Sequence, residues 1–387
     1  MTAYVISSNI ITTAQYDSAI DLVGSDSAYI LEGVTVAATG EDAFGIYAAG
    51  GTSHQIAVYG TVISDLEYAI ELFGTGNDVF IARTGSVYGY SGLYINPGSN
   101  VNVEGSVKAA HGAGILIQAG DNFINIGPTG TLTSEGTGVI VNGFYGGTNS
   151  KVVNSGAIIT TGNDFSHGVN FSSEAGQENQ LVNFGIISAT GHAVEGERGN
   201  ETVINHGRIE GDVDLGAGND LFKGGGGSVD GDIRGRGGND TLIGGVSDDA
   251  IFGDFGDDVL RGAEGDDTLT GGTGRDIMTG GVGSDTFDFN KTIETAVGGE
   301  RDRITDFSQG EDVIDVAGID AKSGVGGNQA FTFIGAAAFS NSAGELRVST
   351  TASGNTIIAG DTDGDGSADF HILATGVTGL TVGDFVL

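Results

Sequence analysis

Short stretches in which apolar and polar residues alternate run through most of the chain, and each is bounded by glycine or asparagine. A two-residue period between turn-forming residues is typical of β-strands rather than helices. In the N-terminal half the pattern repeats as a glycine followed by a β-branched run, at spacings of 20 to 29 residues. The glycines that open these runs are Gly60, Gly85, Gly105, Gly130, Gly156, Gly185, Gly207 and Gly227.

Further apolar runs lie between these repeats, for example after Gly114 and Gly138. A unit of 20 to 29 residues that holds two or three short strands predicts one turn of a parallel β-helix or a similar solenoid. An antiparallel β-sandwich would use similar turns. The repeat continues for longer than one sandwich would need, and this length favours the solenoid.

A second, shorter repeat occupies residues 235–288. The stretch reads as six consecutive nonapeptides: GRGGNDTLI, GGVSDDAIF, GDFGDDVLR, GAEGDDTLT, GGTGRDIMT and GGVGSDTFD. The sixth position is aspartate every time, and the eighth is apolar every time. Strand ends alone do not require an acid every nine residues with an apolar residue two places later. The block therefore predicts a site that is repeated along the chain.

These nonapeptides resemble the RTX repeat, G-G-x-G-x-D-x-U-x. The resemblance implies a parallel β-roll with several calcium ions bound in its turns. Calcium prefers six to eight oxygen ligands, which carboxylates and bare glycine carbonyls can supply. Two nonapeptides make one turn, so the pairs expected to share an ion are 240/258, 258/276, 249/267, 267/285 and, with an earlier match at LGAGNDLFK, 220/240.

The ligands expected from this resemblance are aspartates and glycines of the turns. The aspartates are Asp220, Asp240, Asp249, Asp258, Asp267, Asp276 and Asp285. The glycines are Gly235, Gly237, Gly244, Gly253, Gly256, Gly262, Gly265, Gly271, Gly274, Gly280 and Gly283. Ser247 stands where the fourth-position glycine is expected, and Arg236, Asp254 and Ala263 stand where the second is expected, so sites that use these loops should be weaker. The sequence GGGGSVDGD at residues 224–232 breaks the register and weakens the 220/240 prediction.

Residues 289–387 resemble the C-terminal cap that follows the roll in serralysin-type secreted proteins, on the segments RITDFSQGEDVID, QAFTFIG and AGELR. A β-roll needs such a cap because its open end exposes strand edges. The final residues, DFVL, resemble an uncleaved type I secretion signal, and they are equally compatible with a last strand of the cap. An acidic loop holding Asp361, Asp363, Asp365 and Asp369 predicts either one more calcium ion or a tight hairpin turn.

The amino-acid composition excludes several classes of function. The 387 residues carry 51 acidic and 15 basic side chains, a formal charge of −36, which excludes nucleic acid as a partner. Residues 212–288 hold 17 acids and five bases, so calcium should stabilise this block. There is no cysteine, no apolar stretch of about 18 residues and no basic segment at the N-terminus. We therefore expect a protein without a membrane span, secreted by type I machinery to the extracellular space or cell surface.

An enzymatic role has little support in the motifs. No histidine stands in H-E-x-x-H and no serine in G-x-S-x-G, so neither the serralysin protease nor a lipase is indicated. The alternative is a polysaccharide lyase or epimerase on the solenoid. Against it, Arg83, Lys108, Lys151 and Arg198 are the only lysines and arginines in residues 1–200. His111, His167, His192 and His206 could line one face or be separate turn residues. Tyr88, Tyr90, Tyr94, Phe144 and Tyr145 could stack on glycans.

The expectation is thus an all-β chain with three parts. Residues 1–210 form a β-solenoid, residues 211–288 an RTX calcium β-roll, and residues 289–387 a serralysin-like cap with the secretion signal. Folding of the roll should depend on extracellular calcium. We also expect a structural or interaction role at the cell surface or in the extracellular matrix.

Overall fold

The computed structural model describes residues 2–15, 17–118, 120–143 and 149–387. The aromatic pair Phe144 and Tyr145 therefore lies outside the described residues. The chain divides into two compact units, Met1–Gly216 and Ala217–Leu387. Both are built from short β-strands, and parallel pairing dominates each of them.

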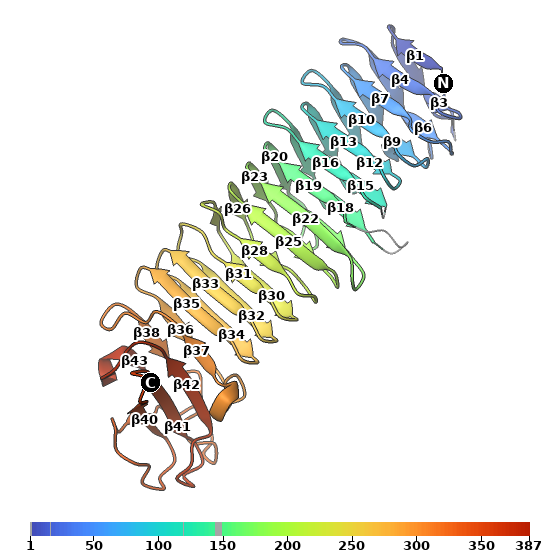
Figure 1. Ribbon diagram of the computed structural model, residues 1–387. Coiled ribbons are helices and arrows are strands. Elements are labelled where there is room, and N and C mark those ends of the chain that lie inside the picture. The colour runs from blue at the N-terminus through green and yellow to red at the C-terminus, as the bar shows by residue number, and fades with distance from the viewer. Residues whose placement is uncertain (1, 16, 119, 144–148) are drawn as a thin grey trace. The chain divides into compact units, whose positions relative to one another are not determined.

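The first unit is a three-sided parallel β-solenoid (Figure 1). Its first sheet contains β1 (Ala3–Ile6), β4 (Ser27–Ile30), β7 (Gln55–Val58), β10 (Asp78–Ile81), β13 (Asn100–Val103), β16 (Phe123–Ile126), β19 (Lys151–Asn154), β22 (Glu178–Asn183) and β25 (Asn200–Asn205). The second contains β2 (Ile10–Thr12), β5 (Thr35–Ala38), β8 (Thr61–Ser64), β11 (Ser86–Gly89), β14 (Ser106–Ala109), β17 (Thr131–Ser134), β20 (Ala157–Thr160), β23 (Ile186–Ser188) and β26 (Arg208–Glu210). The third contains β3 (Ile20–Leu22), β6 (Ile46–Ala48), β9 (Tyr68–Leu72), β12 (Ser91–Ile95), β15 (Ile115–Gln118), β18 (Val139–Asn142), β21 (Val169–Ser172), β24 (Val194–Gly196) and β27 (Val213–Asp214).

The repeated glycine of the sequence opens the strands of the second sheet. Val62, Val87 and Val107 pair in register there and are buried, as the inward position of the repeat requires. A Cβ atom at Gly85 would lie 2.1 Å from the carbonyl oxygen of Val58 in the preceding turn, so only glycine lets the turns stack this closely. The solenoid prediction is confirmed, and the alternative of an antiparallel sandwich is wrong for this unit.

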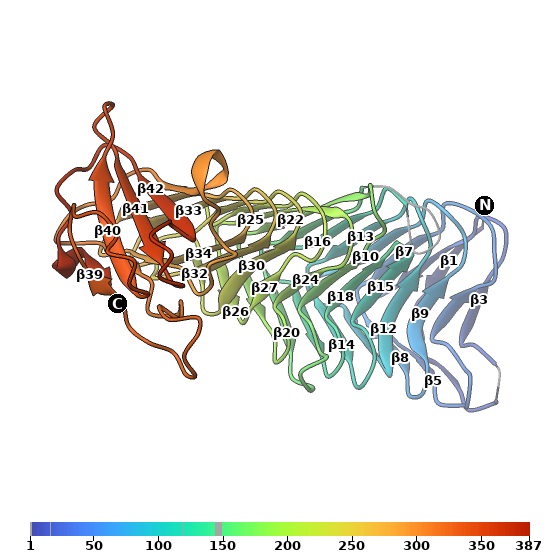
Figure 2. The ribbon, with the colours of Figure 1, turned by 90° about the horizontal axis from the view of Figure 1, so that it is seen from below.

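The second unit begins as a flattened roll with two parallel sheets (Figure 2). One sheet holds β28 (Leu221–Lys223), β31 (Thr241–Ile243), β33 (Val259–Glu264), β35 (Ile277–Val282) and β37 (Asp302–Ile304). The other holds β30 (Asp232–Gly237), β32 (Ala250–Phe255), β34 (Thr268–Thr273), β36 (Thr286–Asp288), β38 (Val313–Asp315) and β43 (Phe385–Val386), and a short strand β29 (Ser228–Val229) precedes it.

Apolar residues at the eighth nonapeptide position fill the inside of this roll. Leu242, Leu260 and Met278 pair in register in one sheet, and all three are fully buried. Ile251, Leu269 and Phe287 do the same in the other sheet. The phase predicted from the nonapeptides is therefore confirmed.

The remaining chain closes the end of the roll with β39 (Thr332–Phe333), β40 (Glu345–Thr350), β41 (Thr356–Asp361) and β42 (Phe370–Ala374), and it includes two short 3-10 turns, η1 (Gly298–Glu300) and η2 (Val382–Asp384). β40, β41 and β42 form an antiparallel meander, and β42 pairs with β37 of the roll. The last strand, β43, pairs with β38. Unpaired edges at the end of the roll are thereby covered.

Candidate metal centres

Two ladders of aspartates run along the loops of the roll. The backbone N–H of Asp240 donates to Oδ1 of Asp258 at 2.7 Å, and the N–H of Asp258 donates to Oδ1 of Asp276 at 2.8 Å. On the other side the N–H of Asp249 donates to Oδ1 of Asp267 at 2.8 Å, and that of Asp267 to Oδ1 of Asp285 at 3.0 Å. The sixth-position aspartates are thus stacked 18 residues apart, as the two-nonapeptide turn predicts.

The first ladder also includes Asp220. Its N–H donates to Oδ1 of Asp240 at 2.8 Å, the same geometry as in the later turns. The break in register at residues 224–232 adds two residues to this turn without removing the contact. The structure therefore brings the 220/240 pair together like the others.

Each ladder continues into the chain beyond the nonapeptides. The N–H of Asp276 donates to Oδ1 of Asp302 at 2.8 Å, and the N–H of Asp285 donates to Oδ1 of Asp312 at 3.0 Å. Sequence reasoning missed these two residues because they follow by 26 and 27 residues rather than 18. A signal was present: both aspartates precede an isoleucine by two positions, as in the repeat.

The second carboxylate oxygen separates these aspartates from ordinary turn residues. Within the described residues, Oδ2 is buried and has no hydrogen-bond partner in Asp240, Asp258, Asp267, Asp276, Asp285 and Asp302. Burying a carboxylate oxygen without a partner costs several kcal/mol, roughly 1–3 kcal/mol even for an uncharged group. Six such atoms at equivalent positions therefore indicate that a cation belongs beside them.

First-position glycines make room for these oxygens. A Cβ atom at Gly262 would lie 2.0 Å from Oδ2 of Asp267, and one at Gly253 would lie 2.3 Å from Oδ2 of Asp258. The same close approach occurs at Gly235, Gly244, Gly271 and Gly280. The first-position glycines therefore shape the space around the Oδ2 atoms of the nonapeptide aspartates.

Fourth-position glycines bring carbonyls of successive loops together. Gly256, Gly274 and Gly283 have φ values of +130°, +144° and +143°, which favour glycine. A Cβ atom at Gly274 would lie 1.9 Å from the carbonyl oxygen of Gly256. In the first repeat the matching glycine is Gly238, at φ +128°, whereas the expected Gly237 has no atom within 4 Å of its Cβ position.

In two ladder aspartates Oδ2 already has a hydrogen-bond partner. In Asp312 it accepts from the N–H of Ser308 at 2.7 Å. The other residue is Asp249. Its Oδ2 accepts a hydrogen bond from the N–H of Gly245 at 2.6 Å, and its Oδ1 accepts one from the Ser247 hydroxyl at 3.2 Å. The Gly245 amide thus engages the oxygen that Asp240, Asp258 and Asp267 leave without a partner, and the serine in place of the fourth glycine adds a bond to the other oxygen. In the other irregular loops Arg236, Asp254 and Ala263 keep positive φ, from +73° to +89°, so their backbone follows the glycine geometry.

Burial raises the pKa of several aspartates in the two ladders. It raises the pKa of Asp258 to about 8, and the hydrogen bond from the Asp240 amide offsets this only in part. Burial also raises the pKa of Asp302 to about 8 and the pKa of Asp276 to about 7. Since carboxylates ligate calcium only when ionised, cation binding must compete with protons in these loops.

The acidic loop at residues 361–369 is a hairpin turn between β41 and β42. Asp361, Asp363 and Asp369 lie with their carboxylate oxygens within 4.8 Å of one another, and Asp365 is not in this group. Both oxygens of Asp361 accept backbone N–H groups, from Gly364 at 2.6 Å and Gly366 at 2.9 Å. These bonds account for the loop as a turn, and calcium binding there stays a prediction.

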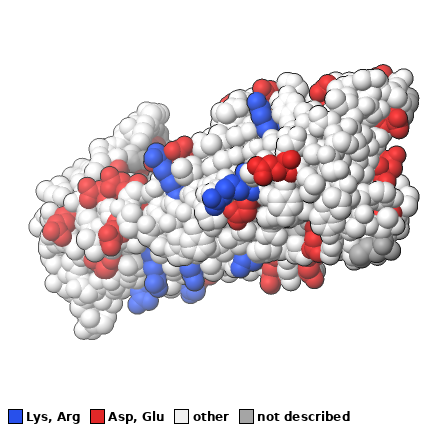
Figure 3. Space-filling view, turned by 90° about the horizontal axis from the view of Figure 1, so that it is seen from above, with Lys and Arg blue, Asp and Glu red and all other residues white. Residues whose placement is uncertain are grey.

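The histidines of the solenoid do not form one row. His167 and His192 lie together with Glu195, whereas His111 contacts Glu135 at 2.9 Å and His206 stacks on Phe184 with ring centroids 5.2 Å apart. On the face drawn in Figure 3, acidic and basic side chains lie in small separate groups on a mostly uncharged surface.

Comparisons with known proteins place the nonapeptides in a family. The RTX calcium-binding nonapeptide repeat, in four copies, matches residues 230–260 and 252–287. RTX calcium-binding repeats are therefore present in this chain, as the pattern predicted. No helix among the described residues has the length and hydropathy needed to cross a bilayer.

Two solved structures match part of this chain. They are the AlgE6R3 and AlgE6R2 subunits of the Azotobacter vinelandii mannuronan C5-epimerase, each 28% identical to this chain. The first covers 38% of this chain and 78% of its own with a TM-score of 0.29, and the second covers 37% and 90% with a TM-score of 0.27. A comparison with curated proteins finds no match.

Proposed function

We propose that this chain is a secreted calcium-binding protein in which calcium drives the folding of the roll and its cap. The observation that carries the proposal is the set of six equivalent Oδ2 atoms, buried without a partner in two aspartate ladders. The loops offer carboxylate oxygens of the ladder aspartates and carbonyl oxygens of glycines such as Gly256, which are the hard ligands that calcium prefers. Imidazoles and thiolates, which softer metals prefer, are not part of the ladders.

Each ladder residue has a defined task in this proposal. The N–H of the preceding turn holds Oδ1 and thereby fixes the carboxylate plane, while Oδ2 faces the ion. In Asp249 and Asp312 Oδ2 also accepts a backbone N–H. First-position glycines leave space beside Oδ2, and fourth-position glycines keep carbonyls bare. The proposed sites are the loop pairs 220/240, 240/258, 258/276 and 276/302 on one side, and 249/267, 267/285 and 285/312 on the other.

Coupling of folding to calcium follows from where the ligands lie in sequence. Each site joins loops 18 or more residues apart, so it exists only once the turns have stacked. A ligand that binds the folded state alone stabilises it in proportion to the logarithm of its concentration. Extracellular calcium modules have affinities of roughly 10⁻⁴–10⁻³ M, which would leave the unit unfolded inside the cell and folded outside.

The C-terminal segment supports export as part of the proposal. Residues 289–387 resemble the serralysin cap, and the final DFVL resembles a type I secretion signal. In the folded unit Asp384 is buried, with Oδ2 accepting from the Thr381 N–H at 2.6 Å and from Gln309 Nε2 at 2.9 Å. A signal of this kind would therefore be read before the cap folds.

The solenoid would then serve as an interaction or structural module at the cell surface or matrix.

A carbohydrate-active solenoid is the second candidate, and one cluster on its third sheet favours it. The rings of Phe44 and Tyr47 stack with centroids 5.0 Å apart, and Tyr68 and Tyr94 meet at 5.3 Å. Glu71 lies between Tyr47 and Tyr94 in the strand register, and burial together with Glu67 raises its pKa to about 7. Aromatic faces beside a protonated carboxyl suit a sugar chain and an acid catalyst.

Amide hydrogen exchange of the full chain, with and without calcium, tests the main proposal. We expect residues 217–387 to exchange quickly in chelator and to become protected in millimolar calcium, while the strands of the solenoid stay protected in both. All ten tyrosines lie before residue 146, so tyrosine fluorescence reports on the solenoid alone and provides the control. Equal protection of 217–387 in chelator and calcium would overturn the proposal.

A further inference from the structure

Strand register brings two histidines and a glutamate together on the outside of the solenoid. β21 and β24 are parallel neighbours in the third sheet, with Val169 opposite Val194 and Asn170 opposite Glu195. His167 and His192 each precede the paired valine by two residues, so they stack one above the other. Glu195 follows Val194 on the same strand. Three potential metal-ligating side chains from two successive turns therefore lie close together.

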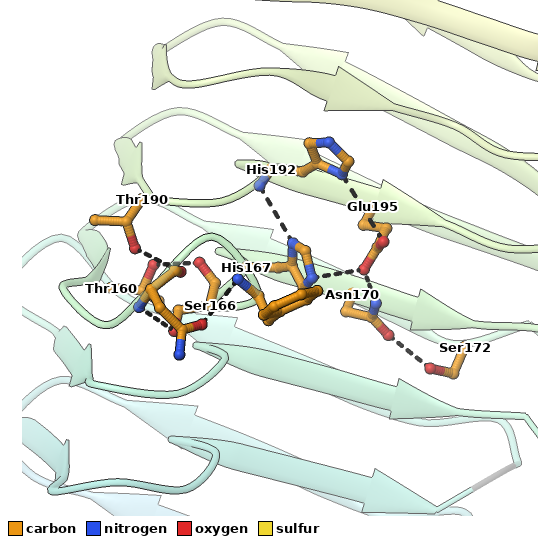
Figure 4. Close-up of polar contacts among 10 residues, drawn as sticks. Thr160, Ser166, His167, Asn170, Ser172, Thr190, His192 and Glu195 are labelled. Carbon is orange, nitrogen blue, oxygen red and sulfur yellow. Dashed lines mark hydrogen bonds and ion pairs between the residues drawn. The ribbon is translucent and has the colours of Figure 1, made fainter.

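The donor atoms face each other at short range (Figure 4). Nε2 of His167 lies 3.0 Å from Oε2 of Glu195, and Nδ1 of His192 lies 3.8 Å from Oε1 of the same carboxylate. One ligand atom from each of the three residues fits within a span of 4.8 Å. Nδ1 of His192 is buried and makes no hydrogen bond within the described residues.

These separations match the edges of a metal coordination polyhedron. Ligands at 2.0–2.1 Å from a tetrahedral ion are about 3.3 Å from one another. Two imidazole nitrogens with one carboxylate are ligands that zinc and related ions accept, whereas calcium prefers oxygen alone. We propose that His167, His192 and Glu195 bind one divalent transition-metal ion of the zinc class, independently of the calcium ladders.

Neighbouring groups orient the carboxylate for this task. Asn170 Nδ2 donates to Oε2 of Glu195, and the Ser172 hydroxyl donates to Oδ1 of Asn170 at 2.6 Å. Outer hydrogen bonds of this kind hold a ligand in position and are common around protein metals. The His167 side chain is 13% exposed, that of Glu195 27% and that of His192 34%, so a fourth ligand can reach the ion from solvent.

Metal binding would change one hydrogen bond in a measurable way. The N–H of His192 donates to Nδ1 of His167 at 3.2 Å, which places the His167 proton on Nε2 in the metal-free chain. A metal on Nε2 moves that proton to Nδ1, and the His192 amide then loses its acceptor. The two ring nitrogens exchange roles, with no net loss of a proton from His167. Proton exchange at the His192 amide is therefore a second readout.

The test uses untagged full-length protein, with Co²⁺ and Zn²⁺ as probes. We expect one Zn²⁺ per chain to remain in 5 mM calcium, and Co²⁺ to give the visible absorption of a tetrahedral nitrogen–oxygen site. His192→Ala and the conservative Glu195→Gln should each weaken binding at least tenfold. His111→Ala is the matched control, because His111 pairs with Glu135 at 2.9 Å but has no second histidine.

Three results of this titration would overturn the site: zinc that is lost in calcium, zinc that survives in both His192→Ala and Glu195→Gln, or zinc that depends on His111. Tyrosine fluorescence checks that each variant keeps the solenoid folded. Slower or faster exchange of the His192 amide on adding Zn²⁺ would support the site, and an unchanged amide would count against ligation by Nε2 of His167.

Discussion

The backbone N–H of Asp240 donates to Oδ1 of Asp258 at 2.7 Å, while Oδ2 of Asp258 is buried with no partner in the described chain. One oxygen of the carboxylate thus fixes the register of two turns, and the other is available to a cation. The same arrangement is found in Asp240, Asp267, Asp276, Asp285 and Asp302, whereas Oδ2 of Asp249 and of Asp312 accepts a backbone N–H. This arrangement explains why the repeat needs aspartate, since asparagine keeps the first oxygen and replaces the second with an amide.

The first prediction compares two neighbouring acids. Asp267→Asn should keep the hydrogen bond from the Asp249 amide and lose the anionic Oδ2, which weakens both 249/267 and 267/285. At calcium concentrations about 100 times the dissociation constant, each lost site removes about 2.7 kcal/mol of calcium-linked stability. For a dissociation constant of about 10⁻⁴ M this requires about 10 mM calcium, and thermal unfolding followed by circular dichroism at that concentration measures the loss.

Asp266→Asn is the control for this change. Asp266 is exposed, and its Oδ1 accepts from the N–H of Ser284 at 2.7 Å, a bond that asparagine preserves. The melting temperature of Asp266→Asn should match that of the unchanged protein. Equal effects of the two substitutions would mean that net charge, and not the ladder, stabilises the roll.

The second prediction concerns the glycines. Gly262→Ala places a methyl group 2.0 Å from Oδ2 of Asp267, so it should destabilise the calcium-bound roll by about 1–3 kcal/mol. Gly237→Ala has open space around its Cβ position and should stay within about 0.5 kcal/mol. The gain from restricting the unfolded chain is common to both changes. Calcium titrations of the two variants, followed by circular dichroism, should therefore differ; identical curves would contradict the assigned role of the first-position glycines.

The third prediction is that the stability of the roll depends on pH, in opposite directions with and without calcium. The folded pKa values of Asp240, Asp258, Asp267 and Asp276, at about 6, 8, 7 and 7, lie above the unfolded value near 3.8. Proton binding therefore stabilises the calcium-free roll fully below pH 4. This stabilisation falls as pH rises above 4 and is lost once pH has passed through the folded pKa values, near pH 8. In chelator the roll should show less β-structure by circular dichroism at pH 8 than at pH 5. In excess calcium, which binds the ionised form, it should melt at higher temperature at pH 8.

The parts of this fold that repeat at a constant spacing could be predicted from the sequence. The nonapeptides identified the inward residues, such as Leu260 and Phe287, and the stacked aspartates, because each turn has the same length. Sequence reasoning missed Asp302 and Asp312, since the insertion before each one breaks the spacing. It also could not place His167 against His192, because solenoid turns vary from 19 to 30 residues and only the strand register shows which side chains stack.

The fourth prediction tests the ladder residues beyond the nonapeptides. Asp302→Asn and Asp312→Asn should each lower the protection of residues 289–387 against hydrogen exchange in millimolar calcium, while residues 240–270 stay protected. Asp315→Asn is the control, because Asp315 lies outside the ladders and its Oδ1 accepts from the Ala317 N–H at 2.8 Å. Uniform loss of protection over the whole unit would instead indicate a general folding defect.

The last prediction separates export from folding. Deletion of the final four residues should leave the chain inside a host that carries a type I exporter, because the proposed signal is gone. The deletion also removes Phe385, whose ring lies 5.4 Å from that of Phe333, so a folding defect must be controlled for. Asp267→Asn provides that control: it weakens calcium-driven folding outside the cell and keeps the C-terminus intact. We expect Asp267→Asn to reach the medium and the truncated chain to stay in the cells, as measured by immunoblot of both fractions. Equal export of the two would show that the DFVL ending is only the last strand of the cap.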